Sequence, residues 1–219
     1  MSKSARSAAA GILALCMFPV SAPAAELLFH QGFESCWSPA LSKAQFLQAL
    51  RSSIDGTSAC LPPQTGTVSG IGYTICSNAN GCGPGVAGCP VAVQSAAFTG
   101  NFQDGAFSAP GTASSIAVPI TTSVLGACTL NLDNIVLGYA LDYLMQVDGL
   151  DGVYSADMLL PLVDVVSYAA SNDCNPVLQS FISTYTPQAL AQAESAAAAA
   201  IEPGLRADTL GQSICPLAD

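Results

Sequence analysis

Few residues in this sequence have the types and spacing that catalysis requires. The single histidine, His30, lies near the N-terminus, and a serine or cysteine nucleophile would depend on it alone as a base. The remaining candidate is a carboxylate pair, Asp142 and Asp157, which we expect diagonally across a long hairpin. Glycoside hydrolysis needs such a pair in a sugar-binding cleft, and the chain has one tryptophan. We therefore expect no enzyme activity and no catalytic residues, and a hydrolase is only our third hypothesis.

Metal, phosphate and nucleic-acid sites are also disfavoured. The glycine-rich segment 78–90 lacks a lysine and contains Cys82 and Cys89, so it indicates a crosslinked loop rather than a phosphate cradle. Asp148 and Asp151 fit a hairpin turn, and no calcium-loop motif surrounds them. The chain has 5 basic and 15 acidic residues, a net charge of −10, whereas a nucleic-acid site needs a basic surface. We expect no cofactor, no metal and no nucleic-acid partner.

The cysteines indicate structural disulfides. Nine are present, and removing Cys16 with the N-terminal segment leaves an even number. No Cys-x-x-Cys pair occurs, so neither a zinc site nor a redox motif is indicated. The eight predicted disulfide cysteines are Cys36, Cys60, Cys76, Cys82, Cys89, Cys128, Cys174 and Cys215.

Sequence proximity suggests how these eight cysteines pair. Cys36 and Cys60 flank the first predicted helix, and Cys174 and Cys215 flank the helical tail. A third pair is expected among the three cysteines of residues 76–89, and the remaining two cysteines form the fourth bridge. Each crosslink would stabilise the fold by about 2–4 kcal/mol.

Residues 1–24 are predicted to be a signal peptide. Lys3 and Arg6 precede an apolar run over 8–20, and an Ala-x-Ala cleavage site ends at Ala24. A lipid anchor on Cys16 is the alternative, but the preceding residue would have to be small and is leucine. No later run of about 18 apolar residues predicts a transmembrane segment.

Residues 25–219 are then one exported domain, periplasmic or extracellular, with a formal net charge of −12 from three basic and 15 acidic residues. Within it, Ser42 and Gln45 form a capping box at the start of a helix that Asp55 ends. Phe46 and Leu50 lie on its apolar face. We expect this helix to pack against an apolar surface.

Alternating apolar residues predict strands over 71–75 and 116–120 and a long hairpin over 135–147 and 153–168. Antiparallel pairing that matches the two apolar rows joins residues whose numbers sum to 301. This register pairs Val147 with Tyr154 and leaves a four-residue loop over 149–152.

Asp164 interrupts the apolar row of the second hairpin strand, and a buried unpaired carboxylate is costly. We favour a bulge at Pro161, which would turn Val163 and Val165 inward. The alternative is a hydroxyl or backbone partner for a buried Asp164.

The C-terminal tail is predicted to be helical. Asn175-Pro176 and Thr186-Pro187 each resemble an N-cap followed by proline at the first helical position. The second helix is rich in alanine, and Pro203 kinks it or begins a third helix. The expected fold class is thus α+β: a long-stranded antiparallel sheet, stapled by disulfides, with one N-terminal helix and C-terminal helices packed on one face.

This layout resembles the tubular lipid-binding superfamily, which includes takeout and the bactericidal/permeability-increasing protein. The resemblance is one of element order over most of residues 25–219. It implies an apolar tunnel between the long helix and the inner face of the sheet. Separately, residues 28–34 (Leu-Phe-His-Gln-Gly-Phe-Glu) are similar to an N-terminal segment of exported gammaproteobacterial proteins, which indicates a bacterial envelope origin.

Two function classes remain open. The first is a non-enzymatic exported module that binds an apolar, lipid-like ligand between the sheet and the C-terminal helices. The second is a structural or adhesive envelope protein with a solid core. An internal apolar cavity of a few hundred Å³ would favour the first class. The oligomeric state stays open. The expected ligand lining is Tyr139, Leu141, Tyr143, Met158 and Leu160.

Overall fold

The computed structural model describes residues 40–148 and 153–215, which belong to one unit spanning residues 35–219. The predicted signal peptide, the segment 28–34, Cys36 and the hairpin loop lie outside the described residues. Among the described helices, none combines the length and apolar content needed to cross a bilayer.

The fold is an eleven-stranded sheet in the order β1-β11-β10-β9-β7-β5-β2, with β3, β4, β6 and β8 branching from it. All described pairings are antiparallel except that of β1 with β11. The strands are β1 (Leu41–Ser42), β2 (Ser58–Leu61), β3 (Gln64–Val68), β4 (Ile71–Ile75), β5 (Cys89–Ser95), β6 (Thr99–Asn101), β7 (Ala106–Ala113), β8 (Ile116–Thr122), β9 (Gly126–Asp148), β10 (Val153–Asn172) and β11 (Ser213–Cys215).

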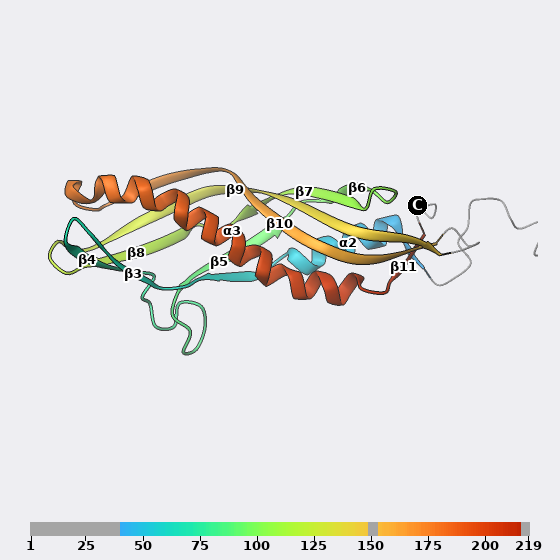
Figure 1. The fold of residues 1–219 in the computed structure, drawn as a ribbon, viewed down its shortest axis with the longest axis horizontal. Helices are drawn as coiled ribbons and strands as arrows, with labels where there is room; N and C mark the ends of the chain where they lie inside the picture. Colours follow the sequence, from blue (N-terminus) through green and yellow to red (C-terminus); the bar gives the residue numbers. More distant parts are fainter. Residues whose placement is uncertain (1–39, 149–152, 216–219) are drawn as a thin grey trace, which may run out of the picture. The chain divides into compact units, whose positions relative to one another are not determined.

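The long hairpin of β9 and β10 forms the centre of the sheet (Figure 1). Its strands have 23 and 20 residues, against a usual five or six. The predicted register is confirmed near the turn, where Val147 pairs with Tyr154 and Tyr143 with Met158. It then shifts between Met158 and Leu160, and Leu141 pairs with Pro161 instead of Leu160.

This bulge decides which side chains of β10 face the core. It lies two residues before the predicted position at Pro161, but its effect is the predicted one: Val163 is buried and Asp164 is exposed. One extra residue reverses the alternation of faces, so Val163 and Val165 lie on the inner face beyond the bulge, as predicted. The large apolar side chains exposed on the opposite face are Leu162, Val166 and Tyr168.

The predicted first helix is confirmed as α2 (Lys43–Ile54). The Ser42 hydroxyl accepts the Gln45 N–H at 3.2 Å, and the Gln45 side chain accepts the Ser42 N–H at 2.8 Å. Phe46 and Leu50 are fully buried, so this helix packs its apolar face into the core as expected.

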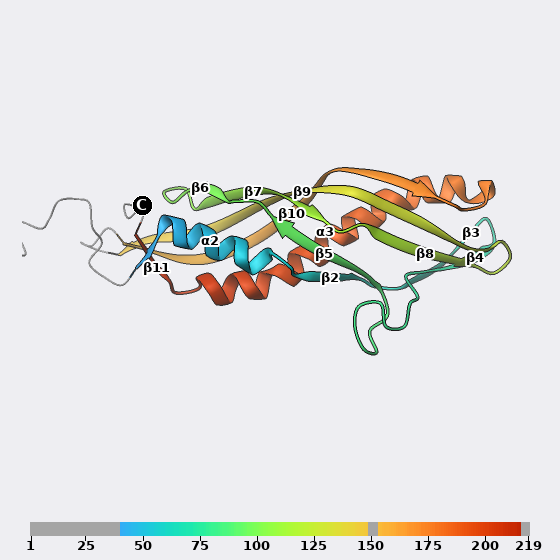
Figure 2. The same cartoon turned by 180° about the vertical axis from the view of Figure 1, so that it is seen from behind.

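The helical tail is one helix rather than two or three. Asn175 caps a short 3₁₀ turn, η1 (Pro176–Leu178), as predicted, and α3 (Gln179–Thr209) then continues through both Pro187 and Pro203. The predicted N-cap at Thr186 is wrong, because its hydroxyl donates to the Ile182 carbonyl at 2.8 Å inside the helix. Figures 1 and 2 show α3 lying along the long strands, with α2 beside its C-terminal half.

The buried stripe of α3 repeats every four residues. Four residues turn an α-helix by about 400°, so each step moves the stripe about 40° around the helix axis. The elements that α3 contacts most are β10, β2 and α2. The buried residues of this stripe are Tyr185, Ala189, Ala193, Ala197, Ile201, Leu205 and Thr209.

Three described disulfides staple the sheet, as the cysteine pattern predicted. Cys76–Cys89 is the expected pair within residues 76–89 and joins the residue that follows β4 to the first residue of β5. Cys60–Cys82 and Cys128–Cys174 overturn the local guesses, which paired Cys60 with Cys36 and Cys174 with Cys215. The guessed and observed pairs have similar sequence separations, so separation could not distinguish them. Strand pairing decides the second bond, because the pairing of Asn172 with Leu130 brings Cys174 beside Cys128.

Cys215 is also disulfide-bonded. The expected α+β class, with a long-stranded antiparallel sheet and helices packed on it, is confirmed.

Candidate functional site

The inner row of β9 fills one end of the core. Tyr139, Leu141, Tyr143 and Met158 are at most 4% exposed, and the Leu160 side chain is not among those described. The Tyr143 ring lies 5.7 Å from both Phe46 and Phe107, in edge-on contacts with each. These four expected lining residues are therefore packed core in this conformation.

Burial also changes the acidity of the tyrosines in this row. It raises the pKa of Tyr143 to about 12, while a hydrogen bond from Thr209 and the nearby Arg206 charge oppose the rise. The pKa of Tyr139 is raised further by burial and by the Asp55 carboxylate. The Tyr139 hydroxyl donates to the Gln94 carbonyl at 3.2 Å, so both tyrosines stay protonated as structural hydrogen-bonding groups at neutral pH.

A small cavity lies further along, between the middle of α3 and the sheet. Its volume is about 10 Å³, which is room for one water molecule at most. On the helix side it is lined by Leu190, Ala193, Glu194 and Ala197. The sheet side is formed by Val91, Val93, Ala113, Ile116, Ile135, Leu137, Val163 and Val165.

Alanine predominates in the buried stripe on the helix wall of this cavity, with the buried Leu190 beside it. Ala189, Ala193 and Ala197 supply the buried stripe here, whereas Tyr185 and Ile201 anchor α3 on either side. Each buried methyl contributes only about 0.8 kcal/mol. The middle of α3 is thus held to the sheet less strongly than its ends.

The alanine segment, residues 189–200, lies between Pro187 and Pro203. A proline inside a helix lacks the N–H that would bond the carbonyl four residues earlier, and its ring crowds that carbonyl. Helices bend at such points. The alanine segment therefore lies between two places where α3 can change direction.

Two charged side chains of α3 cover the free edge of β10. The Glu194 carboxylate accepts the Val165 N–H at 2.7 Å, and Arg206 donates to the Met158 carbonyl at 3.1 Å. Among the described strands, only the short β11 pairs on this side of β10. Unpaired backbone N–H and C=O groups of an edge strand can pair with a strand of another chain. The contacts of Glu194 and Arg206 occupy two of these groups and so prevent such pairing at these positions.

Glu194 was missed by sequence reasoning. It is half-buried and is the one charged residue between Gln179 and Ile201. It lies next to the buried stripe, one position after Ala193 and three before Ala197. The sequence did contain a signal for Glu194, because it is a single charged residue beside the apolar stripe of an alanine-rich helix.

The Asp142 and Asp157 carboxylates lie on the outer face, where both residues are exposed. Asp157 approaches Arg206 at 3.9 Å, with 60% of its side chain exposed. Neither lines the cavity described above. The pair therefore has the surroundings of two solvated surface carboxylates rather than those of an acid and base in a cleft.

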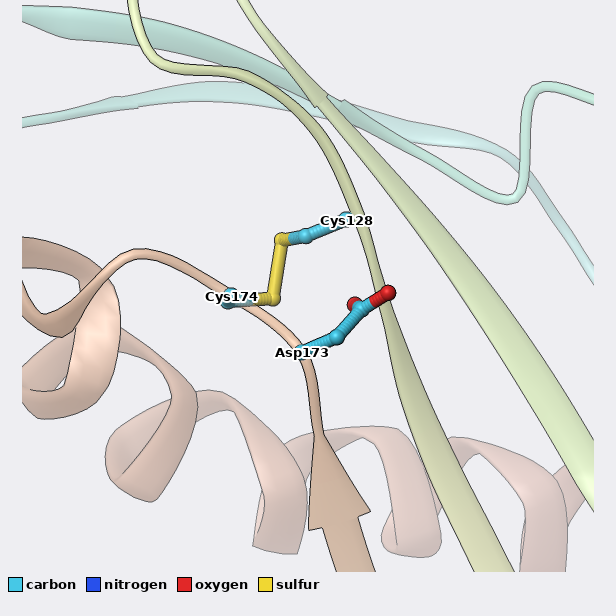
Figure 3. Close-up of side chains that lie close together, drawn as sticks. All are labelled: Cys128, Asp173 and Cys174. Atoms are coloured by element: carbon cyan, nitrogen blue, oxygen red, sulfur yellow. A yellow bond between two sulfur atoms is a disulfide. The ribbon is translucent and has the colours of Figure 1, made fainter.

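Cys128, Asp173 and Cys174 place their ligand-type atoms within 4.8 Å of one another (Figure 3). The two sulfurs are joined in a disulfide, so neither is a thiolate that could bind a metal. The Asp173 carboxylate accepts the Thr129 N–H at 2.6 Å. This cluster closes the open end of the hairpin and is structural.

No protein-family model matches the sequence, and no curated protein matches it significantly. A solved structure with some similarity is the crystal structure of takeout 1 from Epiphyas postvittana, which is 15% identical in sequence. The match covers 74% of this chain and 84% of that chain, with a TM-score of 0.31. At this identity and TM-score the comparison transfers neither a ligand nor an activity to this chain.

Proposed function

We propose that this protein is a non-enzymatic exported module, periplasmic or extracellular, that binds an apolar ligand between the middle of α3 and the sheet. The observation that carries the proposal is the apolar cavity against the alanine segment of α3. Its disulfides support export, since such crosslinks persist in oxidising compartments.

The cavity of about 10 Å³ holds no ligand as it stands, so binding requires the alanine segment to move away from the sheet. That movement exposes three alanine methyl groups and the Leu190 side chain, a loss of roughly 4–5 kcal/mol, and it breaks the hydrogen bond between Glu194 and Val165. An apolar ligand then covers the sheet side chains again. The two prolines let the middle of α3 move while the larger side chains at its ends stay packed.

The alternative is a structural or adhesive envelope protein with a solid core and no ligand. The small cavity volume and the tight aromatic packing around Tyr143 favour it. The two functions differ in one measurable property, because only the first predicts saturable uptake of an apolar molecule.

The test is a titration with an uncharged, environment-sensitive probe, N-phenyl-1-naphthylamine. We expect saturable binding by the parent protein. Ala197→Leu adds volume at the cavity wall and should weaken binding at least tenfold. Ala199→Leu adds the same volume at an exposed position of the same helix and should leave binding unchanged.

A solid core predicts a different result. The parent protein would then show no saturable probe binding, and Ala197→Leu would only destabilise the fold, by about 1–3 kcal/mol for overpacking. That outcome would overturn the ligand-binding proposal and leave the structural one. Native mass spectrometry of protein purified from its own host gives an independent measurement, since a bound apolar molecule would appear as added mass.

A further inference from the structure

We infer that the ligand carries a cationic, hydrogen-bond-donating head group that binds Glu194, as a long-chain amine does. This inference rests on the proposed function and names the chemical class of its ligand. The cavity supplies the first argument: eleven of its twelve lining residues are apolar, and Glu194 is the one that is charged. An apolar chain with a single complementary group at one end fits such a lining.

The Glu194 carboxylate lies at the wall of the cavity. One oxygen, Oε1, accepts the Val165 N–H at 2.7 Å, and a carboxylate offers about four acceptor sites over its two oxygens. It therefore has free acceptor sites for a ligand N–H, and movement of α3 away from the sheet would release the Oε1 site from Val165 as well. Because Glu194 is half-buried, the cavity wall reaches the protein surface here, and a polar head group can stay partly hydrated.

An anionic head group finds no counterpart at this place. Among the described residues, Arg206 is the nearest basic residue along α3, twelve positions or about 18 Å from Glu194. Its guanidinium is already engaged by Glu202 at 2.8 Å and by the Met158 carbonyl. A fatty-acid carboxylate would have to lie beside Glu194 without a cation to offset the repulsion.

The net negative charge of the whole molecule also favours a cationic ligand. The chain has 15 acidic and 5 basic residues, and an acidic surface attracts cations and repels anions on approach. Long-range attraction and the local carboxylate thus both favour an amine over a fatty acid.

The experiment compares three ligands with the same twelve-carbon chain: dodecylamine, dodecanol and dodecanoate. Each displaces N-phenyl-1-naphthylamine from the full-length mature protein, below the critical micelle concentration. We expect the amine to bind at least tenfold more tightly than the alcohol, and dodecanoate to bind most weakly. The amine preference should shrink as salt is added, because the attraction is ionic.

Two variants assign the preference to one carboxylate. Glu194→Gln keeps an acceptor for the Val165 N–H and removes the charge, so the ratio of amine affinity to alcohol affinity, both measured on this variant, should fall to about one. Asp164→Asn removes one charge from the exposed face beside Val165 and should leave the preference unchanged.

The outcomes separate this inference from the proposed function. If neither the probe nor any of the three ligands binds, the proposed function fails and the inference with it. If the probe and dodecanol bind but the amine is not preferred, the inference alone is overturned. The same holds if the amine preference survives Glu194→Gln.

Discussion

Leu141 is enclosed from every side in the inner row of β9. It is 0% exposed and pairs with Phe107 of β7 and Pro161 of β10. A carboxylate at this position would have no cation or hydrogen-bond donor to replace its hydration. We expect Leu141→Asp to lose about 4 kcal/mol of unfolding free energy or to prevent folding, as measured by urea denaturation.

Gln146→Asp is the matched control, because Gln146 is exposed on the same strand. It should change stability by less than about 1 kcal/mol. Equal sensitivity of the two positions would show that the inner and outer faces of β9 are assigned wrongly.

Buried tyrosines make the fold sensitive to alkali. Burial raises the pKa of both Tyr143 and Tyr185 to about 12, from about 10 in the unfolded chain. The unfolded state therefore releases these protons first. Their contribution to stability is complete below pH 10 and is lost as the pH rises from 10 towards 12.

We expect tyrosinate absorbance and loss of circular dichroism to appear together in that range. Tyr143→Phe should make the fall of stability with pH less steep, because one fewer proton is released on unfolding. Ionisation of all tyrosines while the fold stays intact would contradict this account.

The position of Asp164 in the sequence was enough to predict a bulge in β10, but not its exact place. Its charge in an apolar row implied a bulge nearby, and the structure has one two residues before the predicted site. The position within the strand could not be predicted, because a bulge at Leu159 or at Pro161 exposes Asp164 equally well. Glu194 was missed for another reason: its strand partner, Val165, is 29 positions away, and only the fold brings them together.

The proposed function depends on bending of α3 at its two prolines. Replacing either Pro187 or Pro203 by alanine restores a backbone N–H opposite a carbonyl four residues earlier. Each substitution should stabilise the protein by about 1–2 kcal/mol, since the helical gain exceeds the loss of chain restriction in the unfolded state. Thermal unfolding measures this.

The double variant should also bind the neutral probe more weakly, because a straighter, stiffer α3 resists leaving the sheet. Probe titration of the double variant against each single variant tests this. Unchanged probe affinity would show that the prolines do not serve as bending points for ligand entry.

Local signals predicted the start of α2 well and the interior of α3 poorly. The capping box of Ser42 and Gln45 is made within four residues, so the sequence carries all of it. Thr186-Pro187 also resembles a helix start, an N-cap followed by proline, but packing of Tyr185 and Ala189 against the core keeps the helix continuous there. Tertiary contacts that no local pattern contains therefore outweighed the proline.

At the scale of the whole molecule, the described disulfides should differ in their contributions to stability. The stabilisation from loop closure grows with loop length, and the three sequence separations are 46, 22 and 13 residues. We expect losses of about 4, 3.4 and 2.9 kcal/mol on replacing the pairs Cys128/Cys174, Cys60/Cys82 and Cys76/Cys89 by alanine.

Urea midpoints of the three double variants check this order. The largest loss from the pair Cys76/Cys89 would contradict it and would mean that rigidity of the loop between β4 and β5 matters more than closure entropy.

The disulfide that closes the β9–β10 hairpin also has a consequence for proteolysis. A peptide bond cleaved at any single position between Cys128 and Cys174 leaves the two fragments joined through this disulfide. A chain nicked there would therefore migrate as one species on a denaturing gel without reductant and separate into two fragments only after reduction.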